Sequence, residues 1–427
     1  MFANVVPLSY APGNPNHRMK ANHLLTSLAP IFVFAMVGTA QIYDTNNPVV
    51  QTLAGSGFIG YLDGQGTQTM FNYPSKIVSD TYSNLFVVEF YSYVVRKISP
   101  DATVTPFAGG GSSPLPGYGT NVSIGSYAPF LSAAIDRSNA IWITTSSGYL
   151  LRVGSDGYVT KTNMAAFSSQ GAVCVDSTNN IYMTAGNKIY RWRTNGVMEV
   201  FAGSGNPGSL DGNGELCSFL NPTALTVDSA DNLYVWDSAN HLIRRINQNR
   251  DVETISGAQS ADEDGLGRDA DFNTVSALCT DGLGNIYLAC ETSIRRISIQ
   301  TNVTTVAGNF STSGYTNGAG NIARFNQARG ICFSGGNLYV TDTANQRIRS
   351  ISFNPAPQQV SPANLRLSIL AGLDISGTVG RIYRVESSAN TVTWTQRTTL
   401  LLPRSPYRWI DEKPVSGHQF YRAFLLP

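Results

Sequence analysis

Short stretches of alternating hydrophobic and polar residues cover most of the chain after residue 48. Four such stretches lie close together in the middle of the sequence, at residues 224–228, 233–236, 242–246 and 252–256. Turn-forming residues separate them, as in Ser229-Ala230-Asp231-Asn232. A period of two, broken by Asn, Asp and Gly, predicts an antiparallel meander of four strands. No stretch carries a sustained helical period.

The four-strand pattern repeats along the chain. The segment FAGSGNPGSLDGNGELCSFLNPTALTVDSADNLYVWDSANHLIRRI at 201–246 has clear counterparts at 53–98 and 306–351. An asparagine at the start of the second stretch marks six units, at Asn84, Asn139, Asn180, Asn232, Asn285 and Asn337. Four strands per unit at this period predict the blades of a β-propeller. We therefore expect an all-β chain with a six-bladed propeller over residues 49–353.

Four motifs recur in the units: A-G-x-G, P-x-x-[IL]-x-V-D, N-L-Y-V-x-D and R-I-R-x-I. In these motifs the chain resembles the NHL repeat family, most clearly in units one, four, five and six. The resemblance implies a six-bladed propeller in which the first strand of each blade lines a central channel. The sixth unit ends at Phe353 without a fourth strand, whereas residues 49–53 have fourth-strand character. We predict that this N-terminal segment completes the last blade, because pairing removes a free sheet edge.

The first 40 residues have the order of a secretory signal. Lys20 precedes an apolar run at 24–37, and small residues follow up to Ala40. Met19 is a candidate start, and residues 41–48 would form a short leader. We expect a secreted, periplasmic or cell-surface protein of bacterial type, without a membrane span after cleavage. An uncleaved N-terminal anchor is the alternative.

The last 74 residues form a separate region. Residues 354–363 are rich in Pro and polar residues, which is typical of a linker. Beyond it, residues 364–427 hold strand-like stretches at 365–370, 380–388, 391–396, 407–411 and 418–425. They predict a small β-sandwich, which resembles a C-terminal module of bacterial exported proteins.

Charge limits the partners that we expect. Charged residues make up 13% of the chain, about half of the usual 25%. Residues 49–353 carry 19 Lys and Arg against 23 acids, and residues 354–427 carry 8 against 4. The propeller therefore lacks the basic face that binds phosphates, and we expect no nucleic-acid partner. We expect a monomer that binds protein or carbohydrate.

Some charged residues recur in register. Three units pair an acid at the end of the second strand with an Arg on the third: Glu89 with Arg96, Asp237 with Arg244, and Asp342 with Arg349. Units two and three lack both members, and unit five keeps Arg295 opposite Cys290. Because a lone buried charge is costly, the loss of the acid and the arginine together in the same unit predicts that the two form a buried ion pair. A charged ligand site at the channel mouth is the alternative.

A second recurring motif, D-G-x-G, lies in four of the long loops that join the outer strand of one blade to the inner strand of the next. Its leading residues are Asp63, Asp211, Asp264 and, as the variant Asn317. Asp and Asn favour turns and Gly supplies positive φ, so we interpret them as turn residues. One acid per loop is too few for a calcium site of the usual kind.

Catalytic chemistry has few candidates. Of the four histidines only His241 lies in the predicted propeller, so neither a three-histidine zinc site nor a Ser-His-Asp triad is expected there. We predict no cofactor and assign no metal ligands. Cys174, Cys279 and Cys332 share one first-strand position and are expected to be buried thiols.

The remaining candidates are aromatic. Phe90, Tyr91, Tyr93 and Trp236 lie in or beside second-to-third strand loops, with His241 nearby. Exposed aromatic residues there would bind protein or sugar, although packing between blades would use the same residues. The sequence favours an exported binding or scaffold module for protein or glycan ligands, rather than an enzyme. The alternative is a metal-dependent hydrolase or lyase that resembles propeller lactonases, with calcium in the channel.

Overall fold

The computed structural model describes residues 43–127, 129–164, 170–257, 264–355, 365–368, 372–388, 392–402, 407–410 and 420–426. The chain divides into a unit at Tyr43–Ala356 and a second that contains the C-terminal residues from Pro357 onward. The predicted signal region at 1–40 and residues 356–363 of the predicted linker lie outside the described residues. The first two linker residues, Asn354 and Pro355, instead end a strand of the propeller, and the predicted leader is part of a strand from Tyr43 onward. Across the described ranges, no helix combines the length and apolar character needed to cross a membrane.

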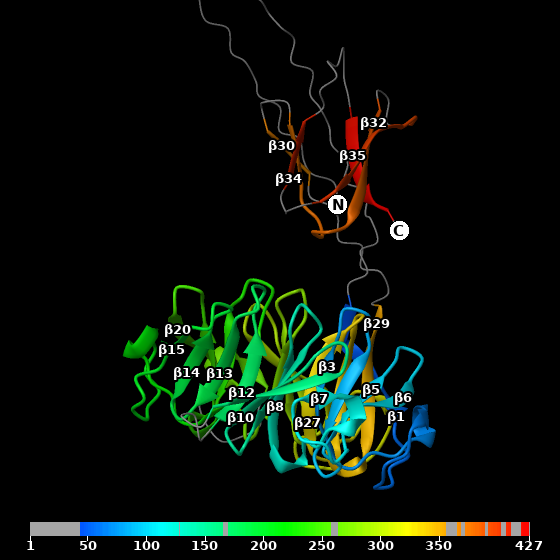
Figure 1. Ribbon diagram of the computed structural model, residues 1–427. Coiled ribbons are helices and arrows are strands. Elements are labelled where there is room, and N and C mark those ends of the chain that lie inside the picture. The colour runs from blue at the N-terminus through cyan, green and yellow to red at the C-terminus, as the bar shows by residue number, and fades with distance from the viewer. Residues whose placement is uncertain are drawn as a thin grey trace, which may run out of the picture. The chain divides into compact units, whose positions relative to one another are not determined.

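The described residues of the first unit form six antiparallel sheets, each with four main strands (Figure 1). The first three sheets contain β3 (Pro74–Ser79), β4 (Leu85–Glu89), β5 (Val94–Ile98) and β6 (Thr103–Gly109); β8 (Phe130–Ile135), β9 (Ile141–Thr145), β10 (Tyr149–Val153) and β11 (Tyr158–Asn163); and β12 (Gln170–Val175), β13 (Ile181–Ala185), β14 (Lys188–Trp192) and β15 (Met198–Ala202). The fourth to sixth contain β17 (Pro222–Val227), β18 (Leu233–Asp237), β19 (Leu242–Ile246) and β20 (Asp251–Ser256); β22 (Ala277–Thr280), β23 (Ile286–Cys290), β24 (Ser293–Ile297) and β25 (Asn302–Gly308); and β27 (Ala328–Ser334), β28 (Asn337–Asp342), β29 (Arg347–Pro355) and β1 (Tyr43–Ala54).

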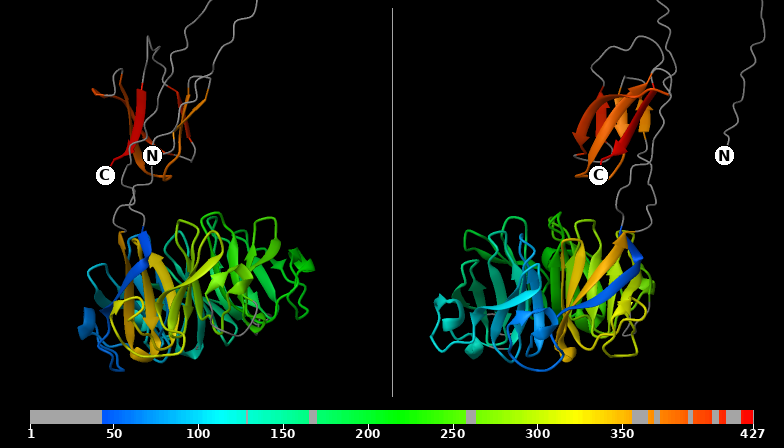
Figure 2. Two further views of the ribbon diagram at one scale, coloured as in Figure 1. Left: turned by 180° about the vertical axis from the view of Figure 1, so that it is seen from behind. Right: turned by 90° about the vertical axis from the view of Figure 1, so that its right-hand side faces the viewer.

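The sheets close into a ring, as the repeat predicts. The innermost strands β3, β8, β12, β17, β22 and β27 contact one another in this order, and β27 contacts β3. The N-terminal strand β1 pairs antiparallel with β29, with Val50 opposite Ile351, and so completes the sixth sheet (Figure 2). The prediction that residues 49–53 close the propeller is confirmed, and the chain is a six-bladed β-propeller followed by a small β-sandwich.

One apolar cluster fills the space between each pair of neighbouring sheets. The strand alternation explains this arrangement: Ile77 packs towards the sixth sheet, whereas the next residue, Val78, packs towards the second. Cys174, Cys279 and Cys332 are buried in three of these clusters, as expected. Burial of this kind on both faces of every blade holds the ring together.

In the described residues, a short strand lies at the outer edge of five blades, and four of these strands belong to the D-G-x-G motif or its Asn317 variant. These two-residue strands are β2 (Gly64–Gln65), β7 (Gly117–Tyr118), β16 (Gly212–Asn213), β21 (Gly265–Leu266) and β26 (Gly318–Ala319). Short 3₁₀ helices occur at Gly66–Gln68, Gly119–Asn121, Gly125–Tyr127, Gly214–Leu216, Ser238–Asn240, Gly267–Asp269 and Thr343–Asn345. Each short strand covers hydrogen-bonding groups that the outermost strand would otherwise leave open.

The second unit is a small β-sandwich of two three-stranded sheets. Its described strands are β30 (Leu365–Ser368), β31 (Gly372–Ile375) and β34 (Tyr407–Ile410) in one sheet, and β33 (Thr395–Leu401), β32 (Ile382–Ser388) and β35 (Phe420–Leu425) in the other. The strand expected at 391–396 instead starts at Thr395, because 392 and 393 form a bend. Val385 and Ala423 are fully buried and pair across β32 and β35.

Candidate functional site

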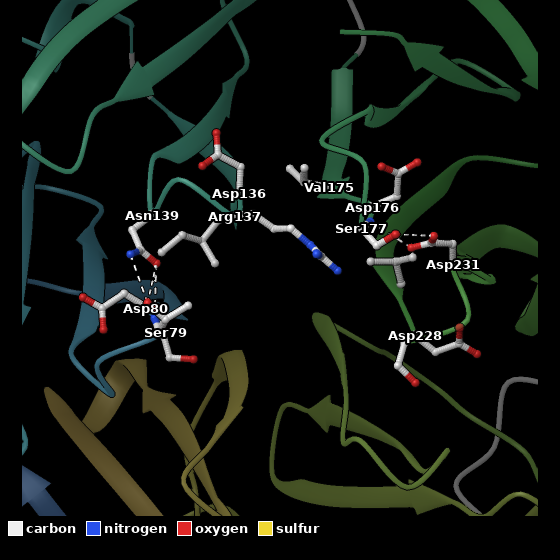
Figure 3. Close-up of a pocket in the computed structure, with 14 residues that line it drawn as sticks. Ser79, Asp80, Asp136, Arg137, Asn139, Val175, Asp176, Ser177, Asp228 and Asp231 are labelled. Atoms are coloured by element: carbon white, nitrogen blue, oxygen red, sulfur yellow. Dashed lines mark hydrogen bonds between the residues drawn. The ribbon is translucent and has the colours of Figure 1, made fainter. Parts of the chain in front are cut away.

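The central channel of the propeller opens at two faces. At one face, which we call the turn face, the first and second strands of each blade are joined by short turns. At the other, the loop face, lie the loops between second and third strands and the D-G-x-G loops. A pocket of about 400 Å³ lies at the turn face and is lined by the first four blades (Figure 3). Pockets of this volume accommodate small ligands.

Five of the lining residues are aspartates, and four of them, Asp80, Asp136, Asp176 and Asp228, organise their own turns. Asp176 shows the pattern: Oδ1 accepts hydrogen bonds from the Thr178 and Asn180 amides, both at 2.8 Å, and Oδ2 accepts one from the Asn180 side chain. Asp80, Asp228 and Asp281 hold their turns in the same way. The repeated D-x-x-x-N spacing is therefore a local turn device.

The second blade departs from this pattern and corrects our alignment of the repeats. In the third blade the Asn180 amide donates to Asp176, whereas in the second blade the Ala140 amide donates to Asp136. Ala140, and not Asn139, is therefore the counterpart of Asn180. The Trp142 indole donates to Asp136 Oδ2 at 2.9 Å in place of the missing asparagine side chain. Asn139 instead takes the preceding turn position, with φ +60°, as Asn179 does with φ +64°.

Residues at that preceding position join neighbouring blades around the pocket. Asn139 accepts a hydrogen bond from the Thr81 amide of the first blade at 3.2 Å. Asp231 accepts bonds from the amide and hydroxyl of Ser177 in the third blade, at 2.8 and 2.6 Å (Figure 3). The fifth blade has Gly284 at this position, which supplies no side chain. The Arg137 amide donates to Asn179 at 3.2 Å, so bonds of this kind link each of the first four blades to the next at the mouth.

The pocket contains one basic side chain. Arg137 is exposed and extends into the opening, while Asp136 and Asp176 lie on the surrounding turns (Figure 3). Burial alone would raise the pKa of Asp136 and Asp176, but hydrogen bonds from their own turns hold both pKa values below the usual one. The acids are thus ionised and committed to the fold at neutral pH. Arg137 remains the group that can donate to a small polar ligand, and sequence reasoning did not identify it.

The recurring Arg–acid pairs form buried ion pairs. Arg96 Nη1 lies 2.9 Å from Glu89 Oε1, Arg244 Nη1 lies 3.0 Å from Asp237 Oδ2, and Arg349 Nη1 lies 2.6 Å from Asp342 Oδ2. All six side chains are 0% exposed. Burial raises the pKa of Glu89, Asp237 and Asp342, and hydrogen bonds from the arginines and nearby amides oppose this.

The D-G-x-G residues supply the second partner of the same arginines. Arg96 Nη2 lies 2.5 Å from Asp63, and Arg244 Nη2 lies 2.8 Å from Asp211. Arg349 Nη2 donates to the Asn317 side chain at 2.9 Å, and Arg295 Nη2 lies 2.9 Å from Asp264. The interpretation of these residues as turn formers alone was incomplete. The pair with Asp264 also explains why unit five keeps Arg295 without a second-strand acid.

The aromatic candidates divide into exposed and buried groups. Phe90, Tyr91 and Tyr93 lie in the loop between β4 and β5 at the loop face, with Tyr91 54% and Tyr93 37% exposed. The Tyr91 ring contacts Tyr73 and Phe90, with centroids 4.9 and 4.8 Å apart. These three residues form the rim cluster. Tyr93 packs separately against Phe130, at 6.4 Å.

Trp236 and His241 do not belong to an exposed site. Trp236 is 2% exposed and packs in the cluster between the fourth and fifth sheets, so the prediction of a surface contact is wrong for this residue. His241 is half-buried with φ +56° and ends the 3₁₀ helix Ser238–Asn240. Its ring packs against Trp236, and Nδ1 lies 3.1 Å from the Phe272 carbonyl oxygen. Both residues stabilise the contact between blades.

His, Cys, Asp and Glu are the side chains that could form a metal site. Among the residues described, no group of three or more His, Cys, Asp or Glu side chains is placed to hold a metal ion. The pocket aspartates fit such a role poorly, because Asp80, Asp176 and Asp228 each direct both oxygens to their own turns. The channel calcium of the alternative function remains a prediction without assigned ligands.

Comparisons with known proteins agree with this fold. The NHL repeat model matches residues 325–349. A search of curated proteins returned no match. A solved protein of unknown function from Bacteroides thetaiotaomicron is similar at 22% identity, with a TM-score of 0.56 over 71% of this chain and 76% of its own.

Two further solved structures are auxiliary nutrient binding proteins. The one from Bacteroides thetaiotaomicron is 18% identical, with a TM-score of 0.54 over 71% of this chain and 76% of its own. The one from Bacteroides ovatus is 16% identical, with a TM-score of 0.54 over 73% of this chain and 77% of its own. Likeness at these identities shows a shared fold. The NHL match lies within the sixth blade and is consistent with this fold.

Proposed function

We propose that this chain is an exported binding protein whose propeller binds a glycan at the loop face of the first blade. The rim cluster of Tyr73, Phe90 and Tyr91 carries the proposal. Tyr91 exposes half of its surface, although its ring is already fixed by two edge contacts with Tyr73 and Phe90. A ring held in this way binds at low entropic cost and offers an apolar face together with a hydroxyl group.

Two other observations support a binding role outside the cell. The first 40 residues have the pattern of a secretory signal. Two solved propellers of similar fold are auxiliary nutrient binding proteins from Bacteroides. A small ligand of nutrient type is therefore a reasonable first choice for the screen.

A glycan array with the purified chain tests the proposal. Positive glycans would then be titrated against Tyr91→Ala, which removes the exposed ring and which we expect to weaken binding about tenfold or more. Tyr82→Ala is the matched control, because Tyr82 is a 74% exposed tyrosine of the same blade at the turn face. No binding to any glycan, or equal loss with the Tyr82 variant, would reject the rim cluster as the site.

A second candidate is docking of a protein on the D-G-x-G loop of the first blade. Phe58 is 71% and Ile59 is 59% exposed, whereas the corresponding residues of the fourth unit are Asn206 and Pro207. Neighbouring exposed apolar side chains of this kind mark protein contacts.

Cross-linking in the producing cells, read by mass spectrometry, tests this second function. Phe58→Asn copies the fourth unit and should abolish the cross-link to a specific partner. Leu210→Asn changes another exposed apolar residue, 69% exposed, in the equivalent loop of the fourth blade and should retain it. A partner that survives Phe58→Asn would exclude this loop as its docking site.

A further inference from the structure

Two basic residues face each other across neighbouring innermost strands. Lys76 lies on β3 of the first blade and Arg329 lies on β27 of the sixth blade. Lys76 Nζ reaches the Arg329 carbonyl oxygen at 3.4 Å, and the Arg329 side chain is exposed. Both strands are innermost strands of their blades, and each residue lies in the half of its strand that is nearer to the loop face.

The close approach of the two strands brings these residues together. A side chain at Gly330 would meet the Ser75 carbonyl oxygen at 2.9 Å and the Lys76 Cα at 3.0 Å. Glycine at this position therefore permits a backbone contact that no other residue would allow. The Thr341 hydroxyl donates to the Ser75 carbonyl oxygen and holds the same junction from β28.

No other blade carries a charge at either position. The residues that correspond to Lys76 are Ser132, Ala172, Ala224, Ala277 and Gly330, and those that correspond to Arg329 are Ser75, Leu131, Gly171, Thr223 and Ser276. The repeat therefore folds with small or neutral side chains here. Two adjacent cations in one junction are an addition to the fold rather than a requirement of it.

Neither cation has an acidic partner in the part of the chain that the structure describes. The ion pairs found there, within 4.0 Å, involve other basic residues. Burial, and secondarily the nearby Arg329 charge, lower the pKa of Lys76 to about 8. The protonated lysine is thus destabilised by its surroundings, and a bound anion would relieve this.

We propose that Lys76 and Arg329 form an anion site in the channel that holds a carboxylate or phosphate group of a small ligand. The Arg329 guanidinium supplies paired donors to two oxygens, and the Lys76 ammonium adds a point charge. Lys76 is three residues from Tyr73 of the rim cluster, a span of at most about 11 Å. The anion site stands independently of glycan binding at that rim.

Calorimetric titration of the purified chain at low salt tests the site, because surface charges are then least screened. The probes are succinate and inorganic phosphate, with succinamide as the neutral control. We expect at least one anion to bind and succinamide not to bind, and the tighter anion identifies the ligand as a carboxylate or a phosphate. Binding of neither anion overturns the proposal.

Variants that copy sister blades locate the bound anion. Lys76→Ala and Arg329→Ser should each weaken binding at least tenfold. Arg268→Ser, which removes a 63% exposed arginine of the 3₁₀ helix Gly267–Asp269, should leave it unchanged. Equal binding by Lys76→Ala, or equal loss with Arg268→Ser, would contradict the assignment. Acetylation of Lys76 in the unaltered chain, measured by mass spectrometry, tests the site without any variant. The bound anion should slow acetylation of Lys76 at least fivefold. Acetylation at the same rate with and without the anion would overturn the proposal. Tyr91→Ala should leave anion binding intact, which separates this site from the rim cluster.

Discussion

Replacing Asp237 with Ala leaves the buried Arg244 with one acidic partner instead of two. Asp237 and Arg244 are both 0% exposed, whereas the second partner, Asp211, is 42% exposed. Removing one member of a buried ion pair costs about 3–5 kcal/mol. Because Asp211 stays in place, we expect Asp237→Ala to lower the unfolding free energy by about 3 kcal/mol, the lower end of that range. Asp211→Ala removes a solvent-screened contact and should cost about 1 kcal/mol.

The third unit of the same chain supplies a compensated variant. It carries Ala185 and Tyr190 where the fourth has Asp237 and Arg244. The double variant Asp237→Ala with Arg244→Tyr removes both charges, so no buried cation is left without its acid. We expect the double variant to lose about 2 kcal/mol less unfolding free energy than Asp237→Ala and Arg244→Tyr lose when their separate losses are added. A coupling of this size is typical of residues in one network.

Urea unfolding followed by tryptophan fluorescence measures these differences. Trp236 precedes Asp237 and is 2% exposed, so its emission reports this blade junction. Equal losses of unfolding free energy in Asp237→Ala and Asp211→Ala would refute the assignment of Asp237 as the stronger partner of Arg244. A double variant whose loss equals the sum of the two single losses would refute it as well. If the pair were instead a ligand site, Asp237→Ala would change affinity and leave the unfolding midpoint nearly unchanged.

Three further outcomes follow from the titratable groups. Asp176 has a folded pKa below its unfolded value of about 3.9, so its stabilising effect is complete above that value and is lost as pH falls through the folded pKa. Asp176→Asn should therefore flatten the acid limb of stability against pH, and an unchanged slope would contradict this. The folded pKa of Lys76 is about 8, against an ordinary lysine value of 10.5, so its destabilising effect, up to about 3 kcal/mol, is present below pH 8 and fades as pH rises to 10.5. The stability of the unaltered chain relative to Lys76→Ala should rise over that range, and a flat difference would be evidence against the lowered pKa of Lys76. Burial raises the pKa of Cys332 to about 12, so Ellman's reagent should modify it only when urea unfolds the propeller; rapid reaction in native buffer would contradict its burial.

The repeat made the fold and part of the Arg networks predictable. Residues that recur together, such as Asp237 and Arg244, reveal a pair because both are lost together in other units. The second partner was missed, although its signal is present: Arg96 follows Asp63, and Arg244 follows Asp211, by the same 33 residues. Three-dimensional contact between these segments depends on how the D-G-x-G loop folds back over the blade, which composition does not reveal.

Residues that occur once were harder to interpret. Trp236 has the loop-end position expected of a ligand contact, but the adjacent fifth sheet covers it, and sequence does not show which side of a strand end is covered. Lys76, Arg137 and Arg329 were overlooked because they break the repeat instead of following it. Aligned units would reveal them as lone charges among neutral residues, so deviation from the repeat is the better indicator of a site.

Affinity of the purified chain for its best glycan tests the central claim most directly, measured side by side for the unaltered chain, Tyr91→Ala and Tyr82→Ala. The rim-cluster proposal predicts saturable binding that weakens about tenfold or more in Tyr91→Ala and is retained in Tyr82→Ala. Saturable binding with the same affinity in all three proteins would contradict it and would place the ligand elsewhere on the propeller.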